Sequence, residues 1–481
     1  MMTSAQTAMI FALSQTISPR AIVTERDAIA PWLDDWRGRY RGAAPALLAP
    51  GSTLEVAAIV RAAAAHRVPL VPQGGNTSMV GGATPPADGS ALILSLRRMD
   101  RMRALDAEAG LAVAEAGVIL QHLHEAAIAA GQRFPLTLGA RGSATVGGLV
   151  STNAGGTQVL RFGTMRRLVV GIEAVLADGS VHNGLAALKK DNRGYDLTQL
   201  LVGAEGTLGI VTAATLRLVP AIVARAVAWV GVACPESALR LLRTLERGTT
   251  LIEGFELLPA ESLDAVVAHV AGARAPLAGR HPWHVLIEAA TSDRAVDPAA
   301  VLEPLLADAL QRGLADDAVV AASEAQAEAF WRIRDSISAS ERALGPATQH
   351  DISVPVDAMP RFMVDAAAAC EARFAGTHAS GFGHLGDGNV HFHVRAPAGA
   401  APTRWYAEVA PEITAFVHDL VAVAGGSISA EHGIGQMKAV ELARLADPAR
   451  MTALRAIKAA LDPQGLFNPG KLVLAPGAAK P

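Results

Sequence analysis

The chain has 481 residues, of which 51% are hydrophobic and 18% charged, so it can form a large buried core and is not a mainly disordered protein. Its formal net charge of -3 and its pI near 6.5 provide no overall basic surface, and nucleic acid is therefore not expected as a partner. The two cysteines, Cys234 and Cys370, stand in no paired motif, which excludes a disulfide framework, an iron–sulfur pattern and a cysteine-type zinc site.

The N-terminal segment MMTSAQTAMIFALSQTISPR has a short apolar stretch that is broken by polar residues and follows no basic region. We therefore predict no signal peptide. No apolar run approaches the ~20 residues that a membrane-spanning helix needs. A cytoplasmic protein is expected, with a peripheral membrane contact left open.

The first ordered elements are expected from about Arg41 onward. Thr53 is expected to cap a helix whose apolar face consists of Leu54, Val56, Ile59 and Val60. A further helix is expected over 119–130, and Asp178-Gly179 is expected to form a hairpin turn. Strands are expected over 68–72, 91–96, 111–118, 169–181 and 208–220.

Three glycine-rich segments lie among these elements, at 72–82, 137–156 and 200–212. Glycines allow positive φ and close approach, and successive N–H groups in PQGGNTSMVGG can form a nest for a pyrophosphate. The G-x-G-x-x-G spacing is missing and PPADGS follows where a helix should begin, so this is no Rossmann fingerprint. One such loop could equally be an ordinary turn, but three in one domain predict a large cofactor.

Strand and helix patterns alternate from Ala221 to Ala424, which indicates an α+β arrangement. The stretch 330–355 is expected to begin as a helix with Trp331, Arg334 and Ser338 on one face. Its arginines form either a solvated basic face or an anion site, and the pattern favours neither.

The segment GHLGDGNVHFHV (383–394) contains three of the 14 histidines, His384, His391 and His393. His391 and His393 should share one strand face, and the Gly-Asp-Gly turn can bring His384 back toward His391. Two neutral imidazoles suit Zn²⁺, Mn²⁺ or Fe²⁺, for which Glu431 of SAEHGIG (429–435) is a natural carboxylate ligand. Its neighbour His432 is a candidate base. This concentration of histidines favours a functional site over structural histidines.

These segments together resemble, over about residues 41–474, the flavoproteins whose FAD domain is shared with vanillyl-alcohol oxidase. The D-lactate, glycolate and D-2-hydroxyglutarate dehydrogenase branch matches best. The resemblance implies an α+β fold, in which two α/β subdomains bind FAD and a cap domain contains an antiparallel sheet. The implied domains are a helical extension (1–40), an FAD-binding domain (41–220), a substrate domain with the metal motif (221–424) and a helical segment returning to the flavin (425–481).

The resemblance also implies how FAD is bound. The first loop cradles the pyrophosphate, and the other two segments line the flavin and adenosine. Some relatives tether the flavin through a histidine in or near the first loop, which this chain lacks, so non-covalent FAD is expected. The implied cofactor-binding residues are Pro72, Gln73, Gly74, Gly75, Asn76, Thr77, Ser78, Gly81, Gly82, Pro135, Leu138, Gly139, Gly142, Ser143, Thr145, Gly147, Gly148, Ser151, Asn153, Gly155, Gly156, Glu205, Gly206, Gly209, Ile210 and Asn468.

The resemblance implies that the metal ligands are His384, His391 and Glu431, and that His432 contacts the substrate hydroxyl as base. Arg334 would bind a distal carboxylate of the substrate. Ser338 matches a substrate-binding position at which the family has a hydroxyl residue. Two substrate positions depart from the family pattern: Gln349 stands where a Lys is usual, and His393 where an Asn is usual. Both departures leave the identity of the acid open.

The expected activity is oxidation of a D-2-hydroxy acid, such as D-2-hydroxyglutarate, by metal-assisted deprotonation and hydride transfer to the flavin. D-lactate, glycolate or another 2-hydroxy acid is an alternative. The electrons would pass to an acceptor such as an electron-transfer flavoprotein, a quinone or a cytochrome, and a homodimer is left open. Two other hypotheses are a metal-free alcohol or lactone oxidase, and a flavin-binding subunit of a redox complex.

Overall fold

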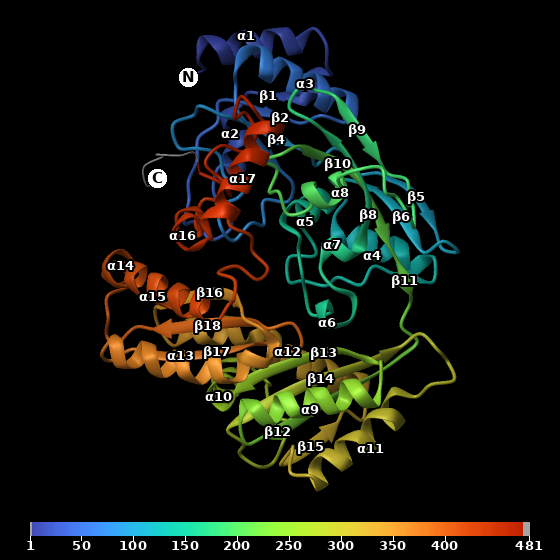
Figure 1. Cartoon of the computed structure of the whole chain (residues 1–481), viewed down its shortest axis with the longest axis vertical. Helices are drawn as coiled ribbons and strands as arrows, with labels where there is room; N and C mark the ends of the chain where they lie inside the picture. Colours follow the sequence, from blue (N-terminus) through green and yellow to red (C-terminus); the bar gives the residue numbers. More distant parts are fainter. Residues whose placement is uncertain (1, 475–481) are drawn as a thin grey trace. The chain divides into compact units, whose positions relative to one another are not determined.

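The computed structural model describes residues 2–474, and the chain divides into two compact units (Figure 1). The first unit consists of Met1–Gly156, Phe162–Ala221 and Glu431–Pro481, and the second of Thr157–Arg161 and Ile222–Ala430. The sequence placed domain divisions after residues 220 and 424. No helix within residues 2–474 is long and apolar enough to cross a membrane.

The first unit begins with a four-stranded sheet in the order β1-β2-β4-β3 (Ile22–Val23, Leu47–Leu48, Leu92–Ser95, Leu70–Gln73). The pairs β2–β4 and β3–β4 are parallel, and β1 is antiparallel to β2. Helix α1 (Ser4–Ser14) packs on α3 (Thr53–His66), and both contribute to the core beside this sheet. The residues expected as an extension, 1–40, therefore add a helix and a strand to the first unit, together with the short α2 (Arg26–Ile29).

The expected cap of α3 was wrong by one residue. Ser52 accepts the Glu55 amide at 3.2 Å, whereas Thr53 donates its hydroxyl to Glu173 at 2.6 Å. Val56, Ile59 and Val60 are buried as expected, but Leu54 is 76% exposed. The buried stripe follows the i, i+3, i+4, i+7 spacing from Val56, and Leu54 lies outside it.

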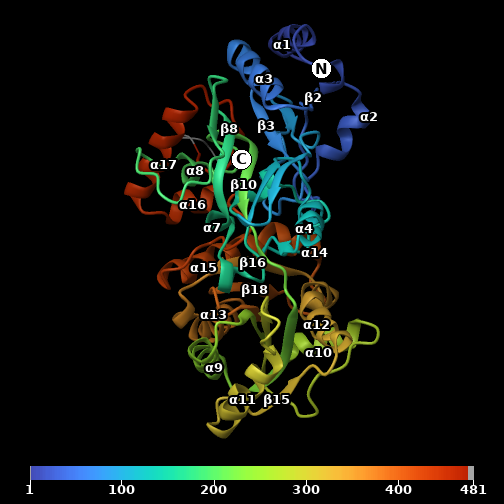
Figure 2. The same cartoon turned by 90° about the vertical axis from the view of Figure 1, so that its right-hand side faces the viewer.

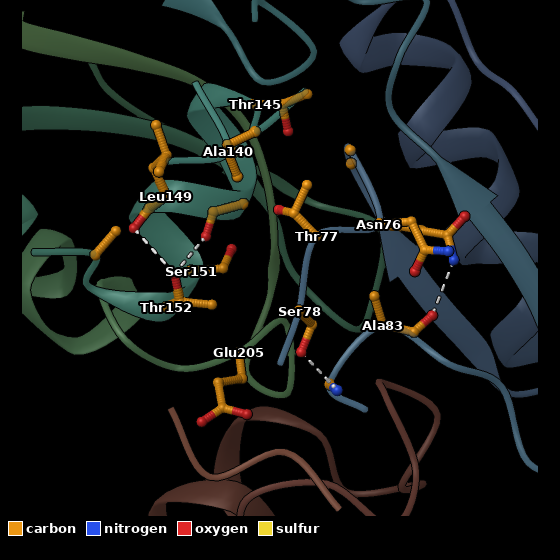
Figure 3. A pocket seen from close by; sticks show the side chains of 18 of the residues that line it. Asn76, Thr77, Ser78, Ala83, Ala140, Thr145, Leu149, Ser151, Thr152 and Glu205 are labelled. Atoms are coloured by element: carbon orange, nitrogen blue, oxygen red, sulfur yellow. Dashed lines mark hydrogen bonds between the residues drawn. The ribbon is translucent and has the colours of Figure 1, made fainter. Parts of the chain in front are cut away.

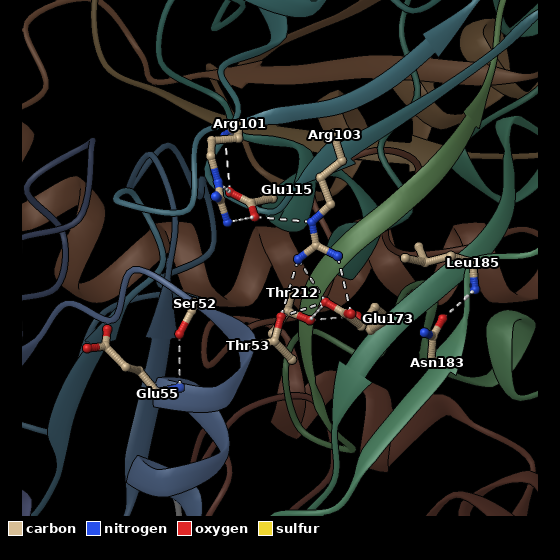
Figure 4. Close-up of polar contacts among 10 residues, drawn as sticks. All are labelled: Ser52, Thr53, Glu55, Arg101, Arg103, Glu115, Glu173, Asn183, Leu185 and Thr212. Atoms are coloured by element: carbon tan, nitrogen blue, oxygen red, sulfur yellow. Dashed lines mark hydrogen bonds and ion pairs between the residues drawn. The ribbon is translucent and has the colours of Figure 1, made fainter. Parts of the chain in front are cut away.

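The second sheet of this unit is antiparallel, with the order β5-β6-β10-β8-β9 (Met102–Asp106, Leu111–Glu115, Ile210–Arg217, Val169–Val175, Val181–Gly184). Arg103 on β5 pairs with Glu115 on β6 and Glu173 on β8, and Thr212 on β10 donates to Glu173 (Figure 4). The expected strands were confirmed, although the one at 169–181 ends at Val175, and β5 and β9 were missed. The helices here are α4 (Leu120–Ala129), α5 (Val146–Thr152), α7 (Met165–Leu168) and α8 (Leu197–Leu201).

The second unit is built on a seven-stranded antiparallel sheet, as expected. Its order is β15-β12-β14-β13-β17-β18-β16 (Asp317–Val320, Ala224–Val232, Trp283–Thr291, Ile252–Pro259, His378–His384, Asn389–Arg395, Ala347–Ser353). β13 was not predicted, because its sequence IEGFELLP contains glutamate, glycine and proline, which are depleted in strands, although all eight residues are buried.

Helices cover both faces of this sheet, as Figure 2 shows. One face packs against α9 (Pro235–Gly248), α11 (Pro298–Gln311), α13 (Met359–Arg373) and α15 (Ala410–Val423). The other packs against α10 (Ala260–His269) and α12 (Glu324–Ala343). Side chains of β12 alternate accordingly: Val230 and Val232 belong to the first core, and Val227 and Trp229 to the second.

The last described segment returns to the first unit through α16 (Ala439–Leu445) and α17 (Pro448–Leu461). Beyond α17, Phe467 forms a parallel bridge with Leu70 of β3, and the Leu70 amide donates to the Leu466 carbonyl at 2.8 Å. Leu466 and Phe467 are buried in the core beside the four-stranded sheet. The first unit is therefore completed by residues far apart in the sequence.

Candidate functional site

The first unit contains a cavity of about 790 Å³ whose walls are the three glycine-rich segments. Figure 3 shows Thr77 and Ser78 of the first segment facing Thr145 and Ser151 of the second, with Glu205 of the third beside them. Most residues expected at the cofactor line this cavity. The expected residues outside its lining are Gly81, Pro135, Asn153, Gly156 and Asn468.

Two of these outlying residues hold the walls in place. The Asn468 side chain donates to the carbonyls of Gly82 and Glu205, at 2.9 and 2.8 Å. Asn153 has a φ of 50° at the end of α5, and its side chain accepts the Arg166 amide at 2.9 Å. They therefore position the loops rather than form the cavity surface.

The first two segments touch so closely that side chains are excluded between them. A Cβ on Gly74 would lie 2.1 Å from Thr145 Oγ1, and one on Gly75 would lie 1.9 Å from the Ser143 carbonyl oxygen. Thr145 Oγ1 is buried and has no hydrogen-bond partner within the described chain. A close backbone cradle with an unpaired hydroxyl fits a large cofactor rich in acceptors, as FAD is.

Sequence reasoning missed Trp36 as a lining residue of this cavity. Trp36 is 62% exposed and follows Asp35, whose carboxylate accepts the Arg37 and Tyr40 amides. No periodicity marks this turn in the sequence. Glu431 and His432 also line the cavity, in a loop of the first unit without regular secondary structure.

The expected histidine arrangement is present in the second unit. Strands β17 and β18 form a hairpin in which Phe382 pairs with His391 and Ser380 with His393. The rings of His384 and His391 lie 5.6 Å apart, and one nitrogen of each lies within 4.8 Å of the other. His391 and His393 both contact the Phe382 ring, so they share a strand face as predicted.

Glu256 on β13 is a site residue that the sequence did not reveal. Its carboxylate contacts His384 Nδ1 at 2.5 Å and accepts from Arg334 Nε at 2.8 Å. Burial acts to raise the pKa of Glu256, but the charges of Arg334 and His384 outweigh it and hold that pKa well below its usual range. A carboxylate at Nδ1 selects the tautomer of His384 in which Nδ1 carries the proton and Nε2 carries the lone pair that a metal ion would bind.

Arg334 on α12 is not a solvated helix residue, since its side chain is only 13% exposed. Besides its bond to Glu256, its Nη2 lies 3.3 Å from His384 Nε2 and its guanidinium lies over the Phe382 ring. Trp331 and Ser338, expected on the same helix face, are half-buried like Arg334. This face of α12 therefore meets the sheet rather than solvent.

The two positions that depart from the family pattern are neighbours in the sheet. Gln349 of β16 pairs with His393 of β18. His393 Nδ1 contacts the buried carboxylate of Glu341, which also accepts from Ser262 Oγ at 3.0 Å. Burial acts to raise the pKa of Glu341, but His393 and the Ser262 hydroxyl together lower it. The Glu341–His393 pair was also missed from the sequence.

Known proteins match nearly the whole chain. A model described as "FAD linked oxidases, C-terminal domain" matches residues 223–472, and one described as "FAD binding domain" matches residues 44–184. D-2-hydroxyglutarate dehydrogenase, mitochondrial, of Arabidopsis thaliana is 35% identical over 463 residues, which are 95% of this chain and 80% of that protein. D-2-hydroxyglutarate dehydrogenase of Xanthomonas citri pv. viticola is also 35% identical, over 96% of both chains.

Among solved structures, p-cresol methylhydroxylase with substrate bound superposes with a TM-score of 0.74 over 98% of both chains. At 15% identity this likeness shows the fold alone. The expected vanillyl-alcohol-oxidase-type α+β fold is thereby confirmed.

Proposed function

This chain belongs to the FAD-linked oxidase family, and from that premise we propose that it is a metal-assisted dehydrogenase of D-2-hydroxy acids. The first acid to consider is D-2-hydroxyglutarate, which is the substrate in the names of the 35% identical relatives. The observation that supports a metal is the pair His384–His391, with the tautomer of His384 set by buried Glu256.

The proposed roles follow from the chemistry of the side chains. FAD, when bound, accepts the hydride from the substrate's α-carbon, and a divalent ion lowers the pKa of the α-hydroxyl. His384, His391 and Glu431 are the proposed ligands of Zn²⁺, Mn²⁺ or Fe²⁺. His432 takes the hydroxyl proton, because an imidazole accepts protons near neutral pH. Glu431 and His432 line the cavity formed by the glycine-rich segments.

Substrate recognition is proposed to involve Arg334, Ser338, Gln349 and His393. Arg334, held by the bond from its Nε to Glu256, is the proposed partner of a distal carboxylate, because a guanidinium suits carboxylate geometry. Gln349 and His393 pair directly on the sheet. The domains proposed for FAD and for substrate are 41–220 and 221–424, with 1–40 and 425–481 supporting the first.

The decisive experiment measures reduction of an artificial dye by purified enzyme with D- and L-2-hydroxy acids, alongside metal and flavin analysis. We expect one enantiomeric series to be oxidised, one divalent ion per chain, and kcat to fall about 10²–10⁴-fold in His432→Ala with a smaller change in KM. A metal-free enzyme with full turnover would favour the alcohol or lactone oxidase alternative. Candidate acceptors (an electron-transfer flavoprotein, a quinone and a cytochrome) can then replace the dye.

A further inference from the structure

Glu205 has a backbone conformation that is unusual for a side-chain-bearing residue. Its φ is 51°, in the left-handed region, and Gly206 follows at 67°. The Glu205 amide donates to the Ser151 carbonyl at 2.7 Å, and its carbonyl accepts from the Asn468 side chain at 2.8 Å. These bonds fix the direction in which the Glu205 side chain leaves the cavity wall.

The carboxylate of Glu205 binds the loop that contains His432. Both oxygens accept backbone amides, from Ile434 and from Gly435, each at 2.7 Å. Gly433 packs so closely that a Cβ there would lie 2.8 Å from a Glu205 oxygen. Figure 3 shows the carboxylate directed at this C-terminal segment, drawn in brown. Residues 431–435 belong to no helix or strand, and besides these two bonds the carbonyls of Ile434 and Gly435 accept the amides of Lys438 and Leu472, each at 3.0 Å.

Two buried lysines surround this contact. Lys438 and Lys471 are 7% and 3% exposed. Burial raises the pKa of Glu205, while the amides of Ile434 and Gly435 and the two lysines act to lower it. Burial lowers the pKa of Lys471 to about 8, while Glu205 acts to raise it. A buried carboxyl group with two amide donors and two nearby lysines is a costly arrangement to maintain for a loop that only connects elements.

We propose that Glu205 is a positioning residue: its carboxylate holds the loop 431–435 so that His432 is fixed for proton transfer. The role of His432 rests on the proposed function, whereas the hold on the loop rests on the geometry of the first unit alone. A misplacement of about 1 Å at a catalytic group can cost about 100-fold in rate, so such a constraint matters for turnover.

Glu205→Gln tests the proposal, because the amide group retains one acceptor and opposes an N–H donor to the other backbone amide. We expect kcat per bound flavin to fall about 10–100-fold, with KM within about 2-fold. In a His432→Ala background the same substitution should add little further loss of anaerobic flavin bleaching, since both changes act through one residue. An equal additional loss would overturn the proposal.

Hydrogen exchange gives a readout that does not depend on activity. Glu205→Gln should accelerate exchange in peptides covering 431–437, because one of the two amides, of Ile434 or of Gly435, loses its acceptor. The matched control is Glu173→Gln, which removes another buried, paired glutamate of this unit (Figure 4) but should leave kcat and this exchange unchanged. If Glu205→Gln fails to yield folded protein, Glu205→Asp, which is too short to reach both amides, replaces it in each measurement.

The outcomes distinguish a failure of the proposed function from a failure of the positioning role of Glu205. Faster exchange with no turnover of any acid by the wild type would reject the proposed function and support the hold on the loop. Normal turnover with unchanged exchange in Glu205→Gln would reject the hold on the loop and leave the proposed function in place.

Discussion

At the residue scale, Glu256 contacts Arg334 and His384 from a buried strand. We expect Glu256→Gln to weaken binding of the divalent ion by about 10–100-fold, because a neutral amide accepts the His384 N–H less strongly than a carboxylate and raises the basicity of the ring less. Metal titration of chelated enzyme measures the change, and the flavin content should stay constant. Glu341→Gln is the matched control, since Glu341 holds His393, which is not a proposed ligand. Equal losses in both variants would contradict the role of Glu256.

A second prediction at the residue scale concerns position 349, where a positive charge can be introduced. Gln349→Lys should raise the ratio of kcat/KM for D-2-hydroxyglutarate over that for D-lactate, because the added cation attracts a second carboxylate. Gln349→Met, similar in size and uncharged, should leave the ratio unchanged or lower it. The gain should weaken with salt to the extent that the new charge is exposed. An unchanged ratio in Gln349→Lys would show that residue 349 does not contact the substrate tail.

The sequence indicated which histidines lie together but not what holds them. His384 and His391 are separated by a short turn, so their proximity follows from local spacing. Glu256 lies 128 positions from His384 and meets it only through the pairing of β13 with β17. Glu341 reaches His393 from a helix. Contacts of this kind depend on the order of strands in the sheet, which no local pattern encodes.

At the element scale, the backbones of the first two glycine-rich segments, 72–82 and 137–156, face each other in close contact. Gly75→Ala should weaken FAD binding by about 10–100-fold, since overpacking costs roughly 1–3 kcal/mol and the obstructing atom is the Ser143 carbonyl rather than a movable side chain. Gly51→Ala is the control, because a Cβ there meets only ordinary contacts, the nearest at 3.4 Å. Flavin titration of the apoproteins compares the two, and equal affinities would contradict the tight cradle.

Apolar strands were predictable from the sequence even where both of their faces are buried. The strand expected at 169–181 is present as Val169–Val175, and the strand at 208–220 and the helix at 119–130 appear within their expected ranges. Strand β13 has the sequence IEGFELLP, and its glutamates, glycine and proline are residue types that are depleted in strands. The short helix α5 lies within a glycine-rich run, where low helix propensity conceals it.

At the scale of the whole molecule, the cavity belongs to one unit and the histidine pair to the other. Because the first loop contains no histidine, acid or heat should release the flavin into the supernatant, where its absorbance measures the yield. Flavin that precipitates with the polypeptide would contradict non-covalent binding.

His384→Ala and His391→Ala should lose the divalent ion and most turnover while keeping FAD.

Ligand binding should also stabilise the molecule unevenly. FAD at about 100 times its Kd adds roughly 2.7 kcal/mol to the unit that binds it. We expect calorimetry of the apoprotein to show a lowered transition for the first unit alone, with the second unchanged. A uniform downward shift of the whole profile would show instead that the two units unfold together.

The interrupted layout of the first unit has a consequence for synthesis on the ribosome. The chain leaves this unit after Ala221 and rejoins it at Glu431, and Phe467 completes the core beside Leu70. A nascent chain therefore exposes an unfinished apolar core while residues 222–430 of the second unit emerge and can fold. A frameshift or premature stop within residues 222–430 would remove Glu431, His432 and Phe467 as well, and would leave the flavin cavity without part of its wall. Partial products should thus be recognised by chaperones and proteases rather than persist as flavin-binding fragments.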